Sequence, residues 1–168
     1  MEWVCSRCGE RHEGLPDLAY DAPDYWAQLT EEERAQSVLE EDLCRVRSVE
    51  GSFLYVRGVL ELPILEADEL FAFGVWGSLS ERSFERFVQL FDDPRRVDEP
   101  PYFSWLSNSL GGYPDTLNLR ASLQVRALDL RPAVVLEPAP HPLSVDQREG
   151  ITLERARALV EPALHPSG

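Results

Sequence analysis

The residues with the most definite chemistry lie at the start of the chain, where two residues separate Cys5 from Cys8 and Gly9 follows directly. A tight turn with this spacing directs two thiols at one point, and glycine has the backbone freedom that such a turn needs. His12 follows closely, and Cys44 is the third and last cysteine. Together these side chains predict a closed, tetrahedral, structural zinc site, in which Cys44 joins the N-terminal segment to the body of the protein.

The same thiols have two other interpretations. A redox pair needs a helix N-terminus that lowers the pKa of a thiol, and the segment from Gly9 to Gly14 has poor helix propensity. Alternatively, Cys44 is a buried strand residue and the first two cysteines are free thiols. His141 is an alternative to His12 as the fourth ligand, whereas His165 lies in a proline-containing tail and is given no role.

The charge of the chain restricts its partners. Its 16 basic residues are all arginine and face 30 acidic residues, which gives a formal net charge of −14. A phosphate backbone is repelled by such a protein, so we expect no nucleic acid as a partner. The simplest explanation of the acidity is that it keeps the protein soluble. With nucleic acid excluded, the expected partner is another protein. A third idea is that the acidic surface mimics nucleic acid and inhibits a DNA-binding protein.

The N-terminal residues do not have the pattern of a secretory signal, in which an apolar run follows a basic segment. Nor does any stretch approach the roughly 18 apolar residues of a membrane span. We therefore predict a cytoplasmic protein that does not enter a membrane. The odd number of cysteines also argues against a disulfide framework.

Capping signals and hydrophobic periodicity predict the elements. Thr30 and Glu33 match a capping box that opens a helix to about Ser37, and Ser80 begins a helix with an apolar stripe. Ser144 and Gln147 match a second capping box, with Gly150 as its stop, and a last helix starts near Thr152. Strands are expected at residues 43–49, 53–60, 70–79, 102–106, 116–125 and 133–136.

These elements predict an α+β fold with a mainly antiparallel sheet of about five or six strands, covered by helices and preceded by a zinc-knuckle-like hook. The length suits a single domain over residues 1–168. Its expected parts are a metal-binding hook at 1–14, a helical segment at 15–42, a sheet with one inserted helix at 43–137 and C-terminal helices at 138–168.

A turn-rich loop precedes the strand predicted at 116–125. It contains Asn108, Tyr113 and Asp115, which together with His141 can line a polar site, because loops on rigid scaffolds often carry function. Ordinary turn chemistry explains the same residue types. The glycine pair in this loop lacks the strand-to-helix context of a phosphate-binding loop, so a nucleotide site is not expected.

Motifs along nearly the whole chain resemble those of a bacterial family, the domain of unknown function numbered 2199. The resemblance implies no reaction, substrate or partner. It implies that the chain is one unit and is consistent with Cys5, Cys8, His12 and Cys44 belonging together. The motifs are Cys5-x-x-Cys8-Gly9-x-x-His12, Asp42-Leu43-Cys44, Arg57 to Pro63, Phe73-Gly74-Val75-Trp76, Tyr113 to Leu117 and His141 to Ile151.

Two functions from different classes follow. The first is a non-enzymatic binding or regulatory module with a closed structural zinc site, which three sulfur ligands favour. The second is a small hydrolase in which an incompletely ligated zinc, or His141 with Asp115 or Asp146, activates water. The sequence contains no nucleophile elbow, H-E-x-x-H pair or phosphate loop that would support the second. No residue is therefore assigned a catalytic role.

Overall fold

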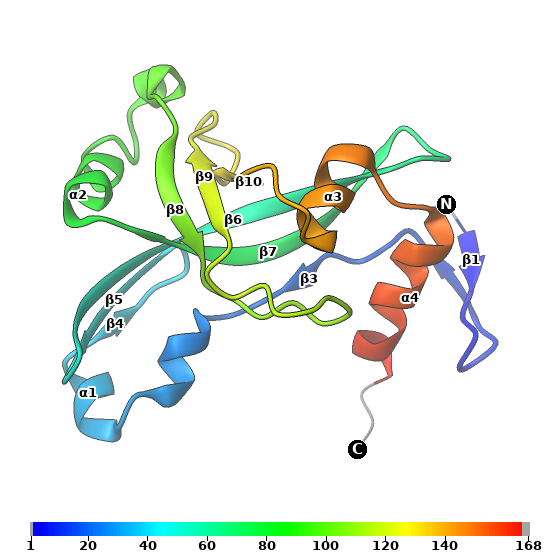
Figure 1. Ribbon diagram of the computed structural model, residues 1–168, viewed down its shortest axis with the longest axis horizontal. Helices are drawn as coiled ribbons and strands as arrows, with labels where there is room; N and C mark the ends of the chain where they lie inside the picture. The colour runs from blue at the N-terminus through cyan, green and yellow to red at the C-terminus, as the bar shows by residue number, and fades with distance from the viewer. Residues whose placement is uncertain (1, 166–168) are drawn as a thin grey trace.

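A closed barrel of five strands forms the centre of the molecule (Figure 1). The computed structural model describes residues 2–165. Around the barrel the strand order is β6, β7, β8, β9, β10 and again β6. Neighbouring strands are antiparallel except β10 and β6, which close the ring in parallel where Ala133 pairs with Val59. The barrel strands are β6 (Gly51–Ile64), β7 (Glu69–Leu79), β8 (Tyr102–Leu106), β9 (Arg120–Gln124) and β10 (Ala133–Leu136).

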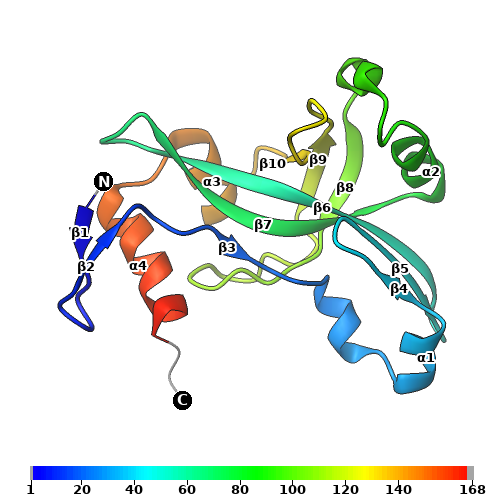
Figure 2. The same ribbon diagram turned by 180° about the vertical axis from the view of Figure 1, so that it is seen from behind.

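Shorter strands and helices extend from the barrel. The strands outside it are β1 (Glu2–Val4), β2 (Arg11–Glu13), β3 (Leu18–Ala19), β4 (Val38–Leu39) and β5 (Leu43–Ser48). The α-helices are α1 (Glu31–Ala35), α2 (Glu81–Gln89), α3 (Pro142–Glu149) and α4 (Leu153–Leu164), and 3-10 turns span Asp24–Gln28 and Pro94–Asp98. The hairpin of β1 and β2 lies beside α4, at the opposite end of the molecule from α1 (Figure 2).

The long strands β6 and β7 belong both to the barrel and to the extensions. β6 pairs with β5 over its first half and with β10 further along, while β7 pairs with β3, β6 and β8. Their shared face is apolar, and Val56, Leu60, Phe73 and Val75 are fully buried. This burial supplies the main driving force for the fold, at about 25 cal/mol for each Å² of apolar surface removed from water.

The expected mainly antiparallel sheet of about five or six strands is therefore corrected to a closed five-stranded barrel with added strands. Glycines allow the close approach that closure requires. A Cβ atom at Gly58 would lie 2.8 Å from Val134 Cγ2 and 2.9 Å from the Pro132 carbonyl, and one at Gly77 would overlap Ser104 Oγ. A two-residue hydrophobic period specifies strands and faces, but it carries no information on whether the first and last strands meet.

Most of the predicted caps are confirmed. Thr30 and Glu33 form both hydrogen bonds of a capping box at α1, and the Ser80 and Thr152 side chains accept backbone N–H groups at the starts of α2 and α4. The capping box predicted at Ser144 is wrong, because α3 begins earlier and His141 is its N-cap. The Ser144 hydroxyl instead donates to the Glu137 carbonyl and anchors α3 to the end of β10.

Candidate metal centre

Two thiols and two imidazoles gather at the end of the molecule where β1, β2 and α4 meet. The ligand atoms of Cys5, Cys8, His12 and His165 all lie within 4.8 Å of one another. Cys5 Sγ is 3.2 Å from His165 Nε2, and Cys8 Sγ is 3.6 Å from His12 Nε2. Zinc–sulfur and zinc–nitrogen bonds of about 2.3 and 2.0 Å in a tetrahedron place such neighbouring ligands about 3.5 Å apart. These two sulfur–nitrogen distances therefore fit a bound zinc ion, and the other pairs stay within the 4.8 Å limit.

The first two ligands come from the turn between β1 and β2. The Cys5 N–H donates to the Glu10 carbonyl, and the Gly9 N–H donates back to the Cys5 carbonyl. Gly9 has a φ of 71°, in the left-handed region that glycine adopts without a steric penalty. This pair of hydrogen bonds closes the turn on itself, so that Cys5 and Cys8 direct their sulfur atoms toward the same point.

His12 is placed by the pairing of the two short strands. It lies opposite Trp3 in the β1–β2 register, with the two ring centroids 4.9 Å apart. Trp3 is almost completely buried, and its indole N–H donates to the Gly14 carbonyl over 2.8 Å. A two-stranded hairpin is marginally stable by itself, so Trp3 provides the packing that orients His12 toward the thiols.

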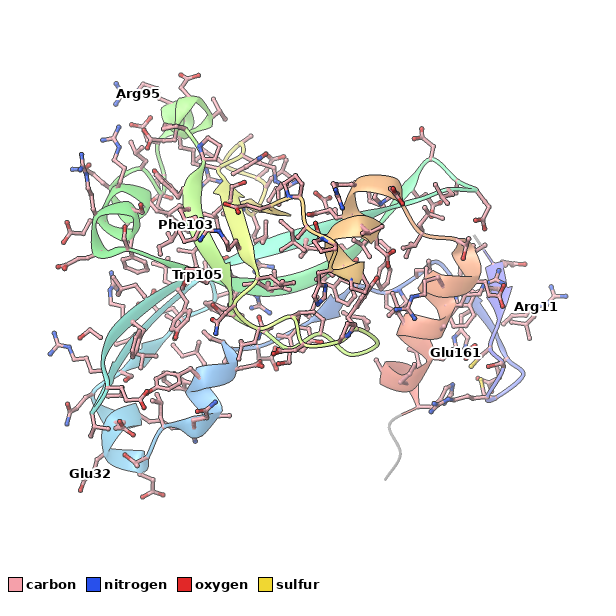
Figure 3. The ribbon with its side chains drawn as sticks, viewed as in Figure 1. Arg11, Glu32, Arg95, Phe103, Trp105 and Glu161 are labelled. Carbon is pink, nitrogen blue, oxygen red and sulfur yellow. The ribbon has the colours of Figure 1, made fainter. Side chains whose placement is uncertain are left out.

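His165 comes from the far end of the chain and is the candidate ligand that sequence reasoning missed. It follows the last residue of α4, and the hairpin is attached to this helix by polar contacts (Figure 3). Glu161 accepts hydrogen bonds from the Ser6 N–H and hydroxyl, and the Arg7 guanidinium donates to the His165 carbonyl over 3.1 Å. The tail position of His165 gave no signal, because only packing brings residue 165 to residue 5.

Cys44 lies outside this group. It is on β5, fully buried in a separate hydrophobic cluster with Leu29, Val46, Tyr55 and Trp76. Burial raises the pKa of its thiol to about 12, which makes it a poor metal ligand and a poor nucleophile. In the structure His165 occupies the place in the group that the sequence gave to Cys44, and Cys44 is the buried strand residue of the alternative interpretation.

Two Cys and two His ligands are a common donor set of structural zinc sites. Soft thiolate and imidazole donors favour zinc over magnesium or calcium, which prefer oxygen. Cys8, His12 and His165 are exposed or half-buried, and Cys5 is buried. In such a site zinc would hold the start of the chain to the last helix, and four protein donors would complete a tetrahedron without a water ligand.

The residues expected to line a polar site bond to other parts of the fold, in two separate sets of contacts. Asn108 is fully buried, and its side chain accepts from the Trp76 N–H and donates to the Ala22 carbonyl and to Asp24. These hydrogen bonds join the loop after β8 to β7 and to the segment that precedes α1. The side chain therefore supports the fold through two bonds to backbone groups and one to a carboxylate.

The other three candidates connect the same loop to α3. The Tyr113 hydroxyl donates to Asp146 over 2.6 Å, and burial together with this bond raises the pKa of Tyr113. His141 Nδ1 accepts the Leu143 N–H, and its Nε2 lies 2.8 Å from the Asp115 carbonyl oxygen. Both ring nitrogens of His141 thus bond to backbone groups, which is the arrangement of a helix cap rather than of a general base.

Arg96 is a buried structural residue that the sequence did not reveal. Its side chain is 5% exposed and donates four hydrogen bonds to backbone carbonyls, those of Phe91, Arg126, Ala127 and Leu130. The guanidinium fork thereby holds the turn between β9 and β10 against the end of α2. Charged residues in loops are usually solvated, so their spacing alone did not predict this structural role.

The fold and the cluster define a small five-stranded barrel protein with a candidate metal centre made of two thiols and two imidazoles. The chain belongs to the family described as an uncharacterised protein conserved in bacteria, DUF2199, whose family model matches residues 4–151. The match includes Cys5, Cys8 and His12, and it ends before α4 and His165. Searches of curated proteins and of solved structures gave no match. Within residues 2–165, no helix has the length and apolar character needed to cross a bilayer.

Proposed function

We propose that this protein is a non-enzymatic binding or regulatory module whose N-terminal hairpin is fixed to α4 by a structural zinc ion. Cys5, Cys8, His12 and His165 are the proposed ligands. The observation that carries the proposal is the 3.2 Å separation between Cys5 Sγ in the first turn and His165 Nε2 at the end of the last helix. Ligands from both ends of the chain would make zinc a link within the fold.

The energetic case for such a link is strong in this part of the molecule. β1 and β2 have three residues each, and a hairpin of this size has little stability of its own. Cys5 and His165 are 160 residues apart in sequence, so the unfolded chain holds no preformed site and the complete ligand set exists only in the folded protein. Because the metal binds the folded site, its binding free energy adds to the free energy of unfolding.

The ligand set also favours a structural over a catalytic role. Catalytic zinc usually has three protein ligands, often imidazole and carboxylate, and keeps one position open for water. Here four donors are in place, two of them thiols, and the group contains no carboxylate. The protein would therefore act through its surface, with the metal maintaining the shape of one end of it.

Metal content and unfolding measured on matched variants test the proposal. We expect native mass spectrometry of the purified protein to show one zinc ion per chain. Cys8→Ser should lose that ion and melt at a lower temperature. Cys44→Ala is the matched control, because it also removes a thiol but leaves the cluster complete, and it should keep the full zinc content.

A Cys8→Ser protein that retained stoichiometric zinc would contradict the assignment of the ligands. Loss of the metal with no change in the melting temperature, and with unchanged hydrogen exchange in residues 2–13, would contradict the structural role. His165→Ala separates the two ends of the site. It should weaken zinc binding at least tenfold if the last helix supplies a ligand, and equal affinity in this variant would exclude His165.

A further inference from the structure

Two large aromatic side chains are exposed side by side on β8. Phe103 and Trp105 are 44% and 40% exposed, with ring centroids 5.0 Å apart (Figure 3). They alternate with the buried Tyr102, Ser104 and Leu106, so they are on the outer face of the barrel. A strand face in contact with water is normally polar, and adjacent exposed aromatic rings are typical of a binding surface.

The pairing of the strands leaves a gap beside these rings. β7 ends at Leu79, which pairs with Leu54 of β6, and its strand pairing with β8 is limited to Gly77 and Ser78. Within residues 2–165, the start of β6 (51–53) therefore pairs with β5 alone, and the start of β8 (102–104) pairs with β9 alone. Two strand edges with unpaired backbone groups face the space that a longer β7 would fill, because the chain turns away into α2 at Ser80.

This gap is a groove of about 700 Å³, which we call the β7-end groove. Its walls include Arg45, Arg47, Phe53, Phe103 and Trp105, and Ser78 and Ser80 lie where β7 ends. A smaller hollow of about 320 Å³ adjoins it and shares Phe53, Ser78 and Trp105. Tyr25 and Tyr55 add two further rings to the hollow, so the main groove has room for a backbone and the hollow has room for an apolar side chain.

The charge of the groove is opposite to that of the whole protein. Arg45 and Arg47 line it, and the single acidic lining residue is Glu81. A third arginine, Arg120 on β9, stacks 4.8 Å from the Phe103 ring centroid and 5.3 Å from that of Trp105. Exposed ion pairs join Arg45 to Glu40 over 3.9 Å and Arg120 to Glu137 over 2.9 Å, and exposed pairs of this kind are weak. In a chain with a net charge of −14, the arginines around the exposed rings therefore still favour an acidic ligand.

We propose that the β7-end groove binds an extended acidic peptide segment of a partner protein, which adds as a strand to the free edge of β8 and inserts one apolar side chain into the hollow. This inference rests on the proposed function as a binding module and identifies its surface and partner. The edge of β8 offers main-chain hydrogen bonds, Arg45 and Arg47 attract the acidic residues, and the aromatic hollow selects an apolar residue.

A synthetic peptide panel on the zinc-loaded protein tests the inference. The probes are fluorescein-labelled peptides of about six residues, the usual strand length, in which glutamate alternates with valine or phenylalanine. We expect fluorescence anisotropy to show saturable binding of these acidic peptides. Matched peptides with lysine in place of glutamate, or with proline at alternate positions, should bind at least tenfold more weakly, because they lose charge complementarity or strand pairing.

Variants of the protein locate the binding. Arg47→Glu in the groove should weaken the peptide at least tenfold, and Phe103→Ala should weaken it several-fold. Arg11→Glu is the matched control, because it changes the net charge equally on an exposed arginine at the other end of the molecule (Figure 3), and it should leave the affinity unchanged. Circular dichroism and zinc content confirm that each variant is folded.

Four outcomes would overturn the inference. They are the absence of saturable binding by any acidic peptide, equal weakening by Arg11→Glu and Arg47→Glu, preferential binding of a short oligothymidylate, and sedimentation that shows a second copy of the chain covering the groove. If these occurred in protein that retained its zinc, the peptide site would be wrong while the zinc-stabilised module remained supported. Loss of zinc from the wild type would instead undermine the proposed function itself.

Discussion

The N-terminal hairpin and the barrel hold their shapes by different means. The barrel buries long strands on one another, and side chains such as Leu60, Phe73 and Val75 have no exposed surface. The hairpin has three-residue strands, a single deeply buried large ring in Trp3, and polar contacts between the hook and α4. Apolar burial is sufficient for the barrel, whereas the hairpin depends on one ring, a few hydrogen bonds and the proposed metal.

The two regions also place cysteine thiols in opposite environments. In the hairpin, the buried Cys5 and the exposed Cys8 lie beside imidazoles, where a bound cation can stabilise a thiolate. In the β5–β6 extension of the barrel, Cys44 is surrounded by apolar and aromatic side chains that penalise its charged form. A cysteine is therefore a ligand or a small hydrophobic residue according to the groups packed around it.

The largest expected difference between the regions is in thiol reactivity. With the pKa of Cys44 raised to about 12 from its ordinary 9.0, its thiolate fraction at neutral pH falls by about a thousandfold. After chelation of the metal, iodoacetamide should modify the exposed Cys8 first, and Cys44 should react only when the protein unfolds. Peptide mass spectrometry over time measures the order, and early labelling of Cys44 would contradict the contrast.

The raised pKa of Cys44 also makes the free energy of unfolding depend on pH in the alkaline range. The folded protein retains the Cys44 proton to a higher pH than the unfolded chain does, so the stabilisation is fully present below about pH 9 and is lost as the pH rises toward 12. Urea unfolding should show the wild type losing stability relative to Cys44→Ala over this range. Parallel curves for the two proteins would be inconsistent with a buried neutral thiol.

Removal of the single large ring of the hairpin has the next largest effect. Trp3→Ala should reduce the free energy of hairpin opening by about 3–5 kcal/mol, because it takes away a 2%-exposed ring and leaves a cavity. Hydrogen exchange of residues 2–13 measures the opening. Val4→Ala, on the same strand at a side chain that is 56% exposed, is the control and should change it by less than about 0.5 kcal/mol. Equal effects of the two substitutions would mean that the indole does not anchor the hairpin.

A smaller effect on stability is expected when a side chain is added where β6 and β10 close the barrel. Gly58→Ala should lower the free energy of unfolding by about 1–3 kcal/mol, because its Cβ would meet Val134 and the Pro132 carbonyl, and a backbone atom cannot move aside cheaply. Gly111→Ala is the control, since no atom lies within 4 Å of its added Cβ. Zinc content should stay complete in both variants, and a loss of metal from Gly58→Ala would show that the two regions are coupled.

Local signals predicted much of the fold. The capping box at Thr30 and Glu33, the cap at Ser80, the helix start near Thr152 and the two-residue periods of β5 and β6 depend on neighbours a few residues away, which the sequence displays directly. The box at Ser144 failed because its hydroxyl bonds to Glu137 on the preceding strand end. The strand predicted at 116–125 begins later, at Arg120, because Thr116 is buried in a turn in which its hydroxyl bonds to Asn108 and Leu110.

The sequence by itself determined the hook. Bond lengths and the backbone freedom of Gly9 are enough for the two-residue spacing of Cys5 and Cys8 to bring both thiols together, with His12 close behind them in the sequence. It also determined which strands carry an apolar face. Only the tertiary structure decided that the barrel closes, that Cys44 is buried and that His165 approaches Cys5 over 160 residues. The reason is physical: local patterns report contacts within one turn or one hairpin, while the choice among distant partners depends on how all the buried surfaces fit together.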